Sequence, residues 1–512
     1  MNIQSVRLVR SPAYRDAMHR LLVPALLAVG CTSPSPSAET PFGTPAAWSK
    51  WTTVDPVVTG RAAPVRRGHR PPDVVLVTID TWRADRLGLY GSPRSATSSV
   101  ASRWAAEGTV FEQAFAPSSW TWPSLASIAT GLYPSAHGAV TPSSALCDAP
   151  DALAEVLGTR GLRTGFSGSS SYVEPSGEAP RDTGFASGFE FFWGRGLASG
   201  EDVLDRAATF LDGVPGEPVF LHLHFYDPHC PFDPSPDALA SAVRQPFGHA
   251  DSEGAFLPDF STAVRAANTC FLVPPPAPSQ REVPLRDRGT DLQAYLDAYD
   301  GELVETDRRL GAVEQLLRAR GRWDGAWVVV TGDHGEEFGD NGRLGHGSSV
   351  FAETTRVPLV VRPPTGDWAR GRRESTPVSL VDLAPTLAAA AGVAPSGSWQ
   401  GRDLGPALRG RGLPVHPVLS ESEYDGASAR LYVDAGLALH RDSRSGRRLF
   451  EIATDPSHRR DLSLRRPADV ERLDAGLEEF EARVEDGSRC APAPRGLTAE
   501  QREQLEALGY LQ

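Results

Sequence analysis

The sequence predicts an α/β fold with a doubly wound, mostly parallel sheet flanked by helices, and a small C-terminal antiparallel subdomain. Continuous apolar runs at 73–80, 218–225 and 326–332 are typical of strands buried on both faces of a sheet. Helical patterns alternate with these runs, as the βα units of such a sheet require. A chain of 512 residues is long enough for one large core and an appendage.

Composition narrows the classes of partner. The chain carries 51 basic and 64 acidic residues, a net charge of -13, which favours neither nucleic acid nor an anionic membrane surface. Its five cysteines show no CxxC or zinc-type spacing, so no thiolate metal site is expected. The sequence carries no signal for an oligomeric state.

Residues 1–31 have the layout of a bacterial lipoprotein signal. Met18, His19 and Arg20 precede an apolar run at 21–29, and small residues lead to Cys31. The run is too short to span a bilayer in the mature protein. We therefore expect an exported chain, lipid-anchored through Cys31 at the cell envelope, in the periplasm or on the cell surface. The alternative is an ordinary cleaved secretory signal or a misassigned N-terminus.

A linker rich in Pro, Ser, Thr and Ala is expected at 32–70, where the composition buries little. If the mature chain is exported, its four remaining cysteines can pair in three ways, and the sequence does not choose among them.

The first buried strand, 73–80, ends on Asp80, which either binds a ligand at the sheet edge or caps the next helix. A helix at 101–108 and a strand at 111–115 follow. Pro123 suits the first position of a further helix that ends at Gly131, so Thr121 lies just ahead of a helix N-terminus. Its hydroxyl is a candidate nucleophile, and the alternative is that Thr121 or Ser119 is a helix cap.

A helix at 152–161 and a strand at 163–168 continue the alternation. The strand at 218–225 leads into a Pro-rich loop that contains Asp227 and His229, and such a loop aims side chains rigidly. His222 and His224 share one face of this strand, and His222 is interpreted as a packed histidine. His229 is the functional candidate here, because a loop offers it no core to fill.

A long insertion at 233–290 precedes a helix at 295–320, whose Asp300, Glu302 and Asp307 are expected on its solvated or hydrogen-bonded face. The strand at 326–332 then delivers Asp333 and His334 to the same sheet edge as Asp80. Oxygen and nitrogen ligands side by side suit a divalent metal.

The loop 341–347 exposes His346 among glycines, either toward a ligand or in a plain turn. A strand at 357–361 and a helix at 380–392 complete the main sheet. Beyond 396, polar-alternating strands at 430–440 and 448–452 predict the small antiparallel sheet, and an amphipathic helix is expected at 499–508.

Together, these motifs resemble the sulfatase branch of the alkaline-phosphatase superfamily. The resemblance covers most of the chain, and its order and spacing are more specific than any single piece. It lies in residues 73–85, Thr121-Trp-Pro-Ser, Asp227-Pro-His, Thr331-Gly-Asp-His-Gly-Glu, Arg356-Val-Pro and Phe450-Glu-Ile-Ala-Thr-Asp-Pro-Ser. It implies a catalytic domain at 71–395 and a small sheet with a tail helix at 396–512.

The resemblance also implies roles for individual residues. A divalent metal (Mn, Zn, Mg or Ca) is expected on Asp80, Thr121, Asp333 and His334, with Thr121 as the nucleophile. His229 would bind substrate or protonate the leaving oxygen, His346 would contact the substrate's charged oxygens, and Asp227 would complete the substrate site. The implied substrate is a small-molecule, glycan or lipid ester of sulfate, phosphate or phosphonate.

This chain departs from the family pattern at the nucleophile. Sulfatases carry a Cys or Ser that becomes formylglycine, then Pro two residues on and Arg four on, whereas Thr121, Pro123 and Leu125 stand here. No formylglycine is therefore expected. Thr81 stands where many sulfatases have a second metal-binding Asp, and His334 where they have Asn, which shifts the preference from calcium towards manganese or zinc.

Three alternatives remain open on the sequence. A two-metal phosphodiesterase would use Asp227, His229 and His346 around a second ion. A phosphotransferase of the same superfamily would pass its covalent group to an acceptor other than water. A catalytically inactive binding homologue would retain only the fold.

Overall fold

The computed structural model describes residues 70–93, 95–146, 151–170, 172, 183–230, 232, 234–243, 292–424, 426–488 and 493–494. The predicted signal at 1–31, the linker except its last residue, most of the insertion at 233–290 and the tail helix at 499–508 lie outside these residues. No helix in the described ranges is long and apolar enough to cross a membrane.

A nine-stranded sheet forms the centre of the described chain, in the order β11-β2-β10-β7-β1-β6-β4-β5, with β12 also pairing with β2. Only β10 runs antiparallel to its neighbours, so the sheet is mostly parallel, as predicted. The strands are β1 (Asp73–Ile79), β2 (Thr109–Phe115), β4 (Arg163–Gly168), β5 (Phe191–Gly194), β6 (Val219–Phe225), β7 (Ala326–Gly332), β10 (Arg356–Arg362), β11 (Arg372–Glu374) and β12 (Val378–Ser379).

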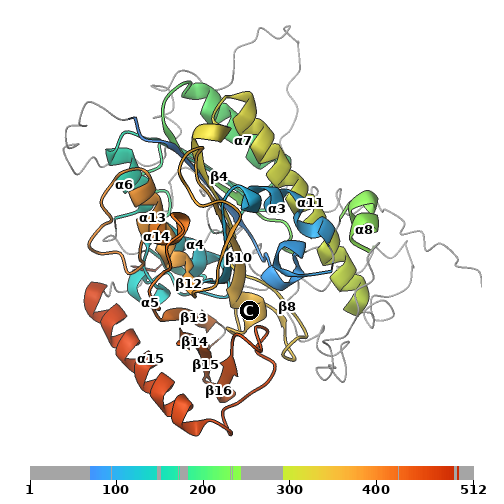
Figure 1. Ribbon diagram of the computed structural model, residues 1–512, viewed down its shortest axis with the longest axis vertical. Coiled ribbons are helices and arrows are strands. Elements are labelled where there is room, and N and C mark those ends of the chain that lie inside the picture. The colour runs from blue at the N-terminus through green and yellow to red at the C-terminus, as the bar shows by residue number, and fades with distance from the viewer. Residues whose placement is uncertain are drawn as a thin grey trace, which may run out of the picture. The chain divides into compact units, whose positions relative to one another are not determined.

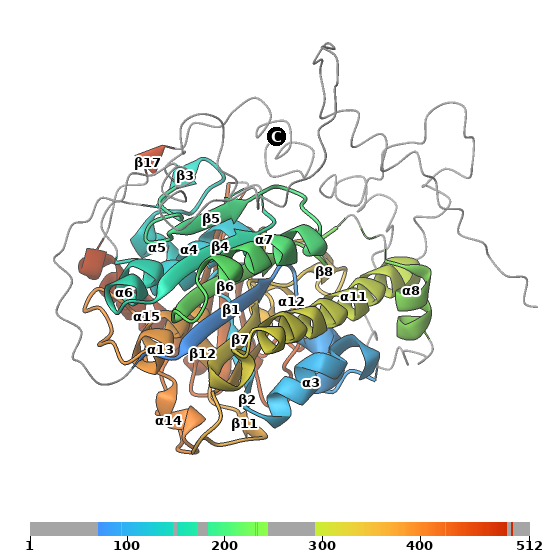
Figure 2. The same cartoon turned by 90° about the horizontal axis from the view of Figure 1, so that it is seen from above.

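Helices cover both faces of this sheet. Figure 1 shows α3, α7 and α11 on one side and α4, α6 and α13 on the other, and Figure 2 shows α7 and α11 lying along the strands. The α helices in the main part of the chain are α3 (Ser99–Ala106), α4 (Thr121–Thr130), α5 (Pro134–His137), α6 (Leu153–Thr159), α7 (Gly200–Gly213), α8 (Pro236–Val243), α11 (Leu292–Ala319), α12 (Ala352–Thr355), α13 (Leu383–Ala390) and α14 (Gly405–Leu408).

The three central strands β7, β1 and β6 are buried along their whole length. Their β-branched and aromatic residues fit a pleated surface that is covered on both sides. The register holds beyond the strand ends, because Asp80 N–H donates to Phe225 O at 2.9 Å and Asp333 N–H donates to Ile79 O at 3.0 Å. The residues that follow β1 and β7 are therefore fixed side by side at one edge of the sheet.

The acidic residues of α11 differ in part from the prediction. Asp300, Glu302 and Asp307 are buried, so the expectation of a solvated face is wrong and that of a hydrogen-bonded face holds. Asp300 pairs with Arg86 at 2.7 Å. Asp307 accepts from the backbone N–H of Val100 and of Ala101 at the start of α3.

The C-terminal part forms the predicted antiparallel sheet, whose strands are β13 (Val418–Tyr424), β14 (Ala427–Asp434), β15 (Leu437–Asp442) and β16 (Gly446–Glu451). The single strand expected at 430–440 is instead a hairpin, because Ala435 and Gly436 both adopt positive φ in a tight turn. An alanine at the first turn position hides this turn from sequence reasoning. Helix α15 (Pro467–Ser488), which the sequence analysis did not predict, packs on the sheet.

Two further two-stranded pairs complete the structure. They are β8 (Glu337–Phe338) with β9 (Leu344–Gly345), and β3 (Ser144–Ala145) with β17 (Ala493–Pro494). His346 directly follows β9.

Candidate metal centre and nucleophile

The ends of β1 and β7 place two carboxylates at one point. Asp80 and Asp333 are both buried, and each has one carboxylate oxygen without a hydrogen-bond partner among the described residues. Burial raises the pKa of Asp80 well above its usual range, and Glu336 raises it further. Burial also raises the pKa of Asp333, opposed by His334. Two buried carboxylates side by side require a compensating positive charge when both are ionised.

Thr121 lies at the start of α4, facing these carboxylates. It is the first residue of the helix and Pro123 the third, so the predicted start at Pro123 was two residues late. The Thr121 hydroxyl lies 3.5 Å from Asp80 Oδ2 and 3.2 Å from His334 Nε2. Ser124, one turn along, donates to Asp333 O at 2.6 Å and so ties α4 to the end of β7.

His334 directs Nε2 toward this group. Its Nδ1 lies 2.9 Å from Gly335 O, and a carbonyl only accepts, so Nδ1 carries the hydrogen. In the neutral ring the lone pair of Nε2 then points at Asp80 Oδ1, 3.2 Å away, and at Asp333 Oδ2, 3.8 Å away. A lone pair facing two carboxylates suits a shared cation.

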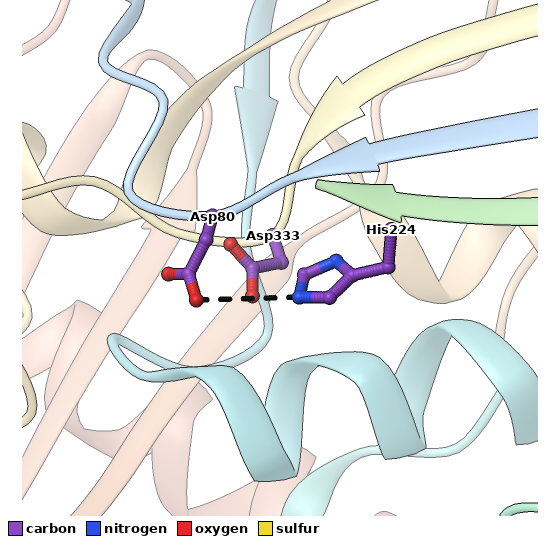
Figure 3. Close-up of side chains that lie close together, drawn as sticks. All are labelled: Asp80, His224 and Asp333. Atoms are coloured by element: carbon purple, nitrogen blue, oxygen red, sulfur yellow. Dashed lines mark ion pairs between the residues drawn. The ribbon is translucent and has the colours of Figure 1, made fainter. Parts of the chain in front are cut away.

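His224 also reaches the carboxylates, although no sequence pattern predicted a role for it in the site. Its Nε2 lies 4.0 Å from Asp80 Oδ2, and one ligand atom each of Asp80, His224 and Asp333 lie within 4.8 Å of one another (Figure 3). The alternation of β6 showed only that His222 and His224 share a face. His222 packs against Phe166 and Phe185, as expected of a core histidine.

The donor set fits a divalent cation. Carboxylate oxygens, imidazole nitrogens with their lone pairs inward and a hydroxyl converge in a buried place, and buried acceptors without donors are rare unless an ion joins them.

The loop after β6 holds His229 rigidly. The Asp227–Pro228 peptide is cis, and His229 Nδ1 donates to Cys230 O at 2.7 Å. Tyr226 hydroxyl donates to the same carbonyl at 2.9 Å. Burial and, to a smaller extent, the neighbouring His346 together lower the pKa of His229 to about 3. The ring is therefore neutral at physiological pH, with Nδ1–H fixed by Cys230.

Asp227 and Cys230 have other partners. Asp227 forms an ion pair with Arg309 at 2.8 Å. Cys230 is disulfide-bonded, and all other cysteines of the chain lie outside the described residues, so its partner lies there as well.

His346 lies between His229 and His334. Its ring centroid is 5.1 Å from that of His229 and 4.6 Å from that of His334. Nδ1 of His346 lies 3.0 Å from Glu336 Oε1. Burial raises the pKa of Glu336 to about 7, opposed by His229 and His334. Gly347 adopts a positive φ and donates its N–H to Ser119 O, which joins this loop to the segment before Thr121.

Two departures from the family pattern have clear places in the structure. Leu125 is fully buried in the main apolar core, so this helix position faces packing and not the carboxylates. Thr81 has a positive φ of 52°, and its hydroxyl is buried without a partner among the described residues.

Comparison with known proteins identifies the family. The family model described as Sulfatase matches residues 72–393. The multifunctional alkaline phosphatase superfamily protein PehA of Trinickia caryophylli is 29% identical over 241 residues, which are 43% of this chain and 41% of that protein. The match thus spans less than half of PehA.

Longer matches agree. The uncharacterized sulfatase YidJ of Escherichia coli K12 is 24% identical over 76% of this chain and 83% of its own. The phosphonate monoester hydrolase of Agrobacterium radiobacter has a similar fold, with a TM-score of 0.64 and 22% identity over 83% of this chain and all of that one. The chain therefore belongs to the sulfatase family, a family of ester hydrolases, as its sequence predicts.

Proposed function

We propose that the protein is a metal-dependent hydrolase of sulfate, phosphate or phosphonate esters, with Thr121 as the nucleophile. The observation that carries this proposal is the position of the Thr121 hydroxyl, 3.5 Å from Asp80 and 3.2 Å from His334, at the first residue of a helix. A helix N-terminus adds a positive dipole end, which favours the anionic group of such an ester.

Asp80, Asp333 and His334 would hold the divalent cation together with Thr121. Such a cation supplies Lewis-acid chemistry, which lowers the pKa of a nearby hydroxyl and offsets negative charge on sulfuryl or phosphoryl oxygens. The Thr121 hydroxyl would give its proton to solvent and its oxygen would bond to sulfur or phosphorus. The bond from that atom to the leaving oxygen would break, and the leaving oxygen would take up a proton. Water then cleaves the threonine ester and regenerates the hydroxyl.

His229 and His346 are suited to the substrate side of the reaction. His229 would bind the substrate, or would protonate the leaving oxygen after Nε2 has taken up a proton, because the neutral ring carries its hydrogen on Nδ1. His346 would contact the non-bridging oxygens. Support comes from their burial next to His334 and from the fixed ring of His229.

The geometry favours a single ion over the two-metal phosphodiesterase. Asp227, which would have to bind the second ion, is ion-paired with Arg309. A guanidinium next to that carboxylate opposes a second cation at the same place.

Export and lipid anchoring are also part of the proposal. The disulfide at Cys230 supports an oxidising compartment, because such bonds persist mainly in exported proteins. Small-molecule, glycan or lipid esters of the cell envelope or its surroundings would then be the substrates.

Turnover of nitrophenyl sulfate, phosphate and phosphonate by the metal-loaded protein tests the proposal. We expect Thr121→Ala to abolish turnover, and a sulfuryl or phosphoryl group to be found on Thr121 by mass spectrometry after acid quenching of the wild type. Thr130→Ala is the matched control, because Thr130 lies in the same helix and its hydroxyl bonds to backbone groups of Ala126 and Leu132 and not to the carboxylates, so it should retain activity.

Equal rates for the wild type and Thr121→Ala would remove Thr121 from the mechanism. No turnover of any ester by the wild type would favour the inactive homologue. Transfer to an added alcohol in preference to water would favour the phosphotransferase.

A further inference from the structure

One hydroxyl on β1 fixes the hydrogens of two histidines on β6. Thr78 Oγ1 lies 3.0 Å from His222 Nε2 and 2.9 Å from His224 Nδ1. The same hydroxyl donates to Leu223 O at 3.2 Å. The parallel register of β1 and β6 sets Thr78 opposite His224, which explains this arrangement.

The tautomer of His224 follows from counting hydrogens. A hydroxyl has one hydrogen and two lone pairs, and Leu223 O can only accept. With its hydrogen committed to that carbonyl, Thr78 accepts from both rings, so His222 Nε2 and His224 Nδ1 are the protonated nitrogens. In the neutral ring the lone pair of His224 is therefore on Nε2.

That lone pair points into the carboxylate group. His224 Nε2 is buried and has no hydrogen-bond partner among the described residues, and the same is true of Asp80 Oδ1 and Asp333 Oδ2. Figure 3 shows the ring of His224 directed at the two carboxylates. One oxygen of each carboxylate and one ring nitrogen of His224 lie within 4.8 Å of one another, and buried acceptors this close together cost free energy unless a cation joins them.

We propose that His224 is a further ligand of the cation held by Asp80 and Asp333, with the Thr78 hydroxyl fixing its ring for that purpose. The inference rests on the metal-dependent function proposed above and adds to it a ligand and a choice of metal.

The extra imidazole determines the class of metal. Thr81 stands where many sulfatases are expected to have a further metal-binding Asp, so the chain lacks one anionic oxygen and gains a neutral nitrogen from another strand. Two imidazoles with two carboxylates favour a first-row transition ion such as zinc or manganese over calcium or magnesium, which prefer oxygen ligands. The site therefore carries one negative charge fewer than a sulfatase site with the additional Asp.

Metal affinity of the purified full chain, measured by competition with a chromogenic chelator, tests this assignment. We expect zinc to bind much more tightly than calcium, and His224→Ala to weaken zinc binding at least as much as Thr78→Val. Loss of an orienting partner such as Thr78 typically costs about 10- to 100-fold in metal affinity. Cobalt-loaded protein gives a second readout, since its visible absorption should change in His224→Ala.

His137→Gln is the matched control. His137 is another fully buried histidine, but its two ring nitrogens bond to Ser127 Oγ and Ala139 N–H. This variant should bind zinc as the wild type does. A circular dichroism melt of each variant separates loss of a ligand from loss of the fold.

The outcomes distinguish this inference from the proposed function. The role of His224 alone would be overturned if folded His224→Ala kept its zinc affinity and cobalt spectrum. In that case Asp80→Asn would still lose zinc binding and Thr121→Ala would still lose turnover. Zinc binding unaffected by Asp80→Asn as well would overturn the metal site itself. Calcium binding more tightly than zinc in the wild type would overturn the choice of metal.

Discussion

Glu336 and His346 are hydrogen-bonded to each other, and we expect Glu336 to contribute to catalysis only by orienting His346. The hydrogen bond between His346 Nδ1 and Glu336 Oε1, 3.0 Å, directs the other ring nitrogen away from the carboxylate. His346→Ala should therefore lower kcat by roughly 10²- to 10³-fold, the loss typical of removing one group that contacts the transition-state oxygens. Glu336→Ala should lower kcat by a smaller factor, because the ring remains but is no longer oriented.

A double-mutant cycle checks this prediction. If Glu336 acts through His346, adding Glu336→Ala to His346→Ala should change kcat/KM little. Glu337→Gln is the control, because the neighbouring carboxylate bonds to Ser349 instead. Independent, multiplying effects of the two substitutions would contradict the pairing.

The sequence predicted the position of some site residues but not of others. Asp80 and Asp333 were predicted at one edge because each directly follows a buried strand, and parallel strands end at the same edge. The place of His224 in the site was not predicted, because alternation along β6 tells which face of the strand carries His224 but not which residues pack against that face. Its surroundings depend on the register of β1 against β6, which sets Thr78 opposite it and which no local pattern encodes.

At the scale of elements, α11 caps the start of α3 through Asp307. Asp307 accepts from two backbone N–H groups at the start of α3, which have no partner within the helix itself. Asp307→Ala would leave buried donors unsatisfied, at a cost of about 1–3 kcal/mol for each such group. We expect a lower urea midpoint with an unchanged slope.

Gln315→Ala, on the exposed side of the same helix, should leave that midpoint unchanged and serves as the control. Asp307→Asn should fall between the two, because its amide keeps one accepting oxygen. A midpoint for Asp307→Ala equal to that of Gln315→Ala would show that this cap does not stabilise the fold.

Helices and strands were predicted best where a single local sequence pattern is sufficient to identify them. Apolar runs identified the central strands, and strand β4 has the bounds predicted for it. The order of the strands and the antiparallel direction of β10 were not predicted, because they depend on contacts between distant segments. The hairpin at Ala435 was not predicted, because its turn lacks the Asn-Gly or Asp-Gly pair that usually marks residues with positive φ.

At the scale of the whole molecule, the C-terminal sheet is part of what holds the site. Ser420 Oγ donates to Ala116 O at 2.6 Å and Glu421 N–H donates to Pro117 O at 2.8 Å, four to five residues before Thr121. Ser422 Oγ donates to Gly347 O, next to His346. Strand β13 thus braces both the segment that leads to the nucleophile and the loop of His346.

The same sheet covers apolar surface of the main part of the chain. Phe115, Val350 and Phe351 share one core cluster with residues of β13 to β16, and Leu132 and Tyr133 share another with β13 and α15. A chain cut to the family-matched residues 72–393 would expose these side chains, each worth about 1.5–3 kcal/mol when buried. We therefore expect that fragment to be insoluble, or to melt without a cooperative transition.

Soluble yield and calorimetry of the fragment beside the full chain check this expectation, with Leu464→Ala in the full chain as a control. Leu464 belongs to the C-terminal part but is 97% exposed, so its loss should change neither yield nor melting temperature. A soluble fragment with one sharp transition and nitrophenyl ester turnover would show that the main sheet needs no such cover. The full chain should instead melt in a single step, because the two sheets share buried clusters and cannot lose their packing separately.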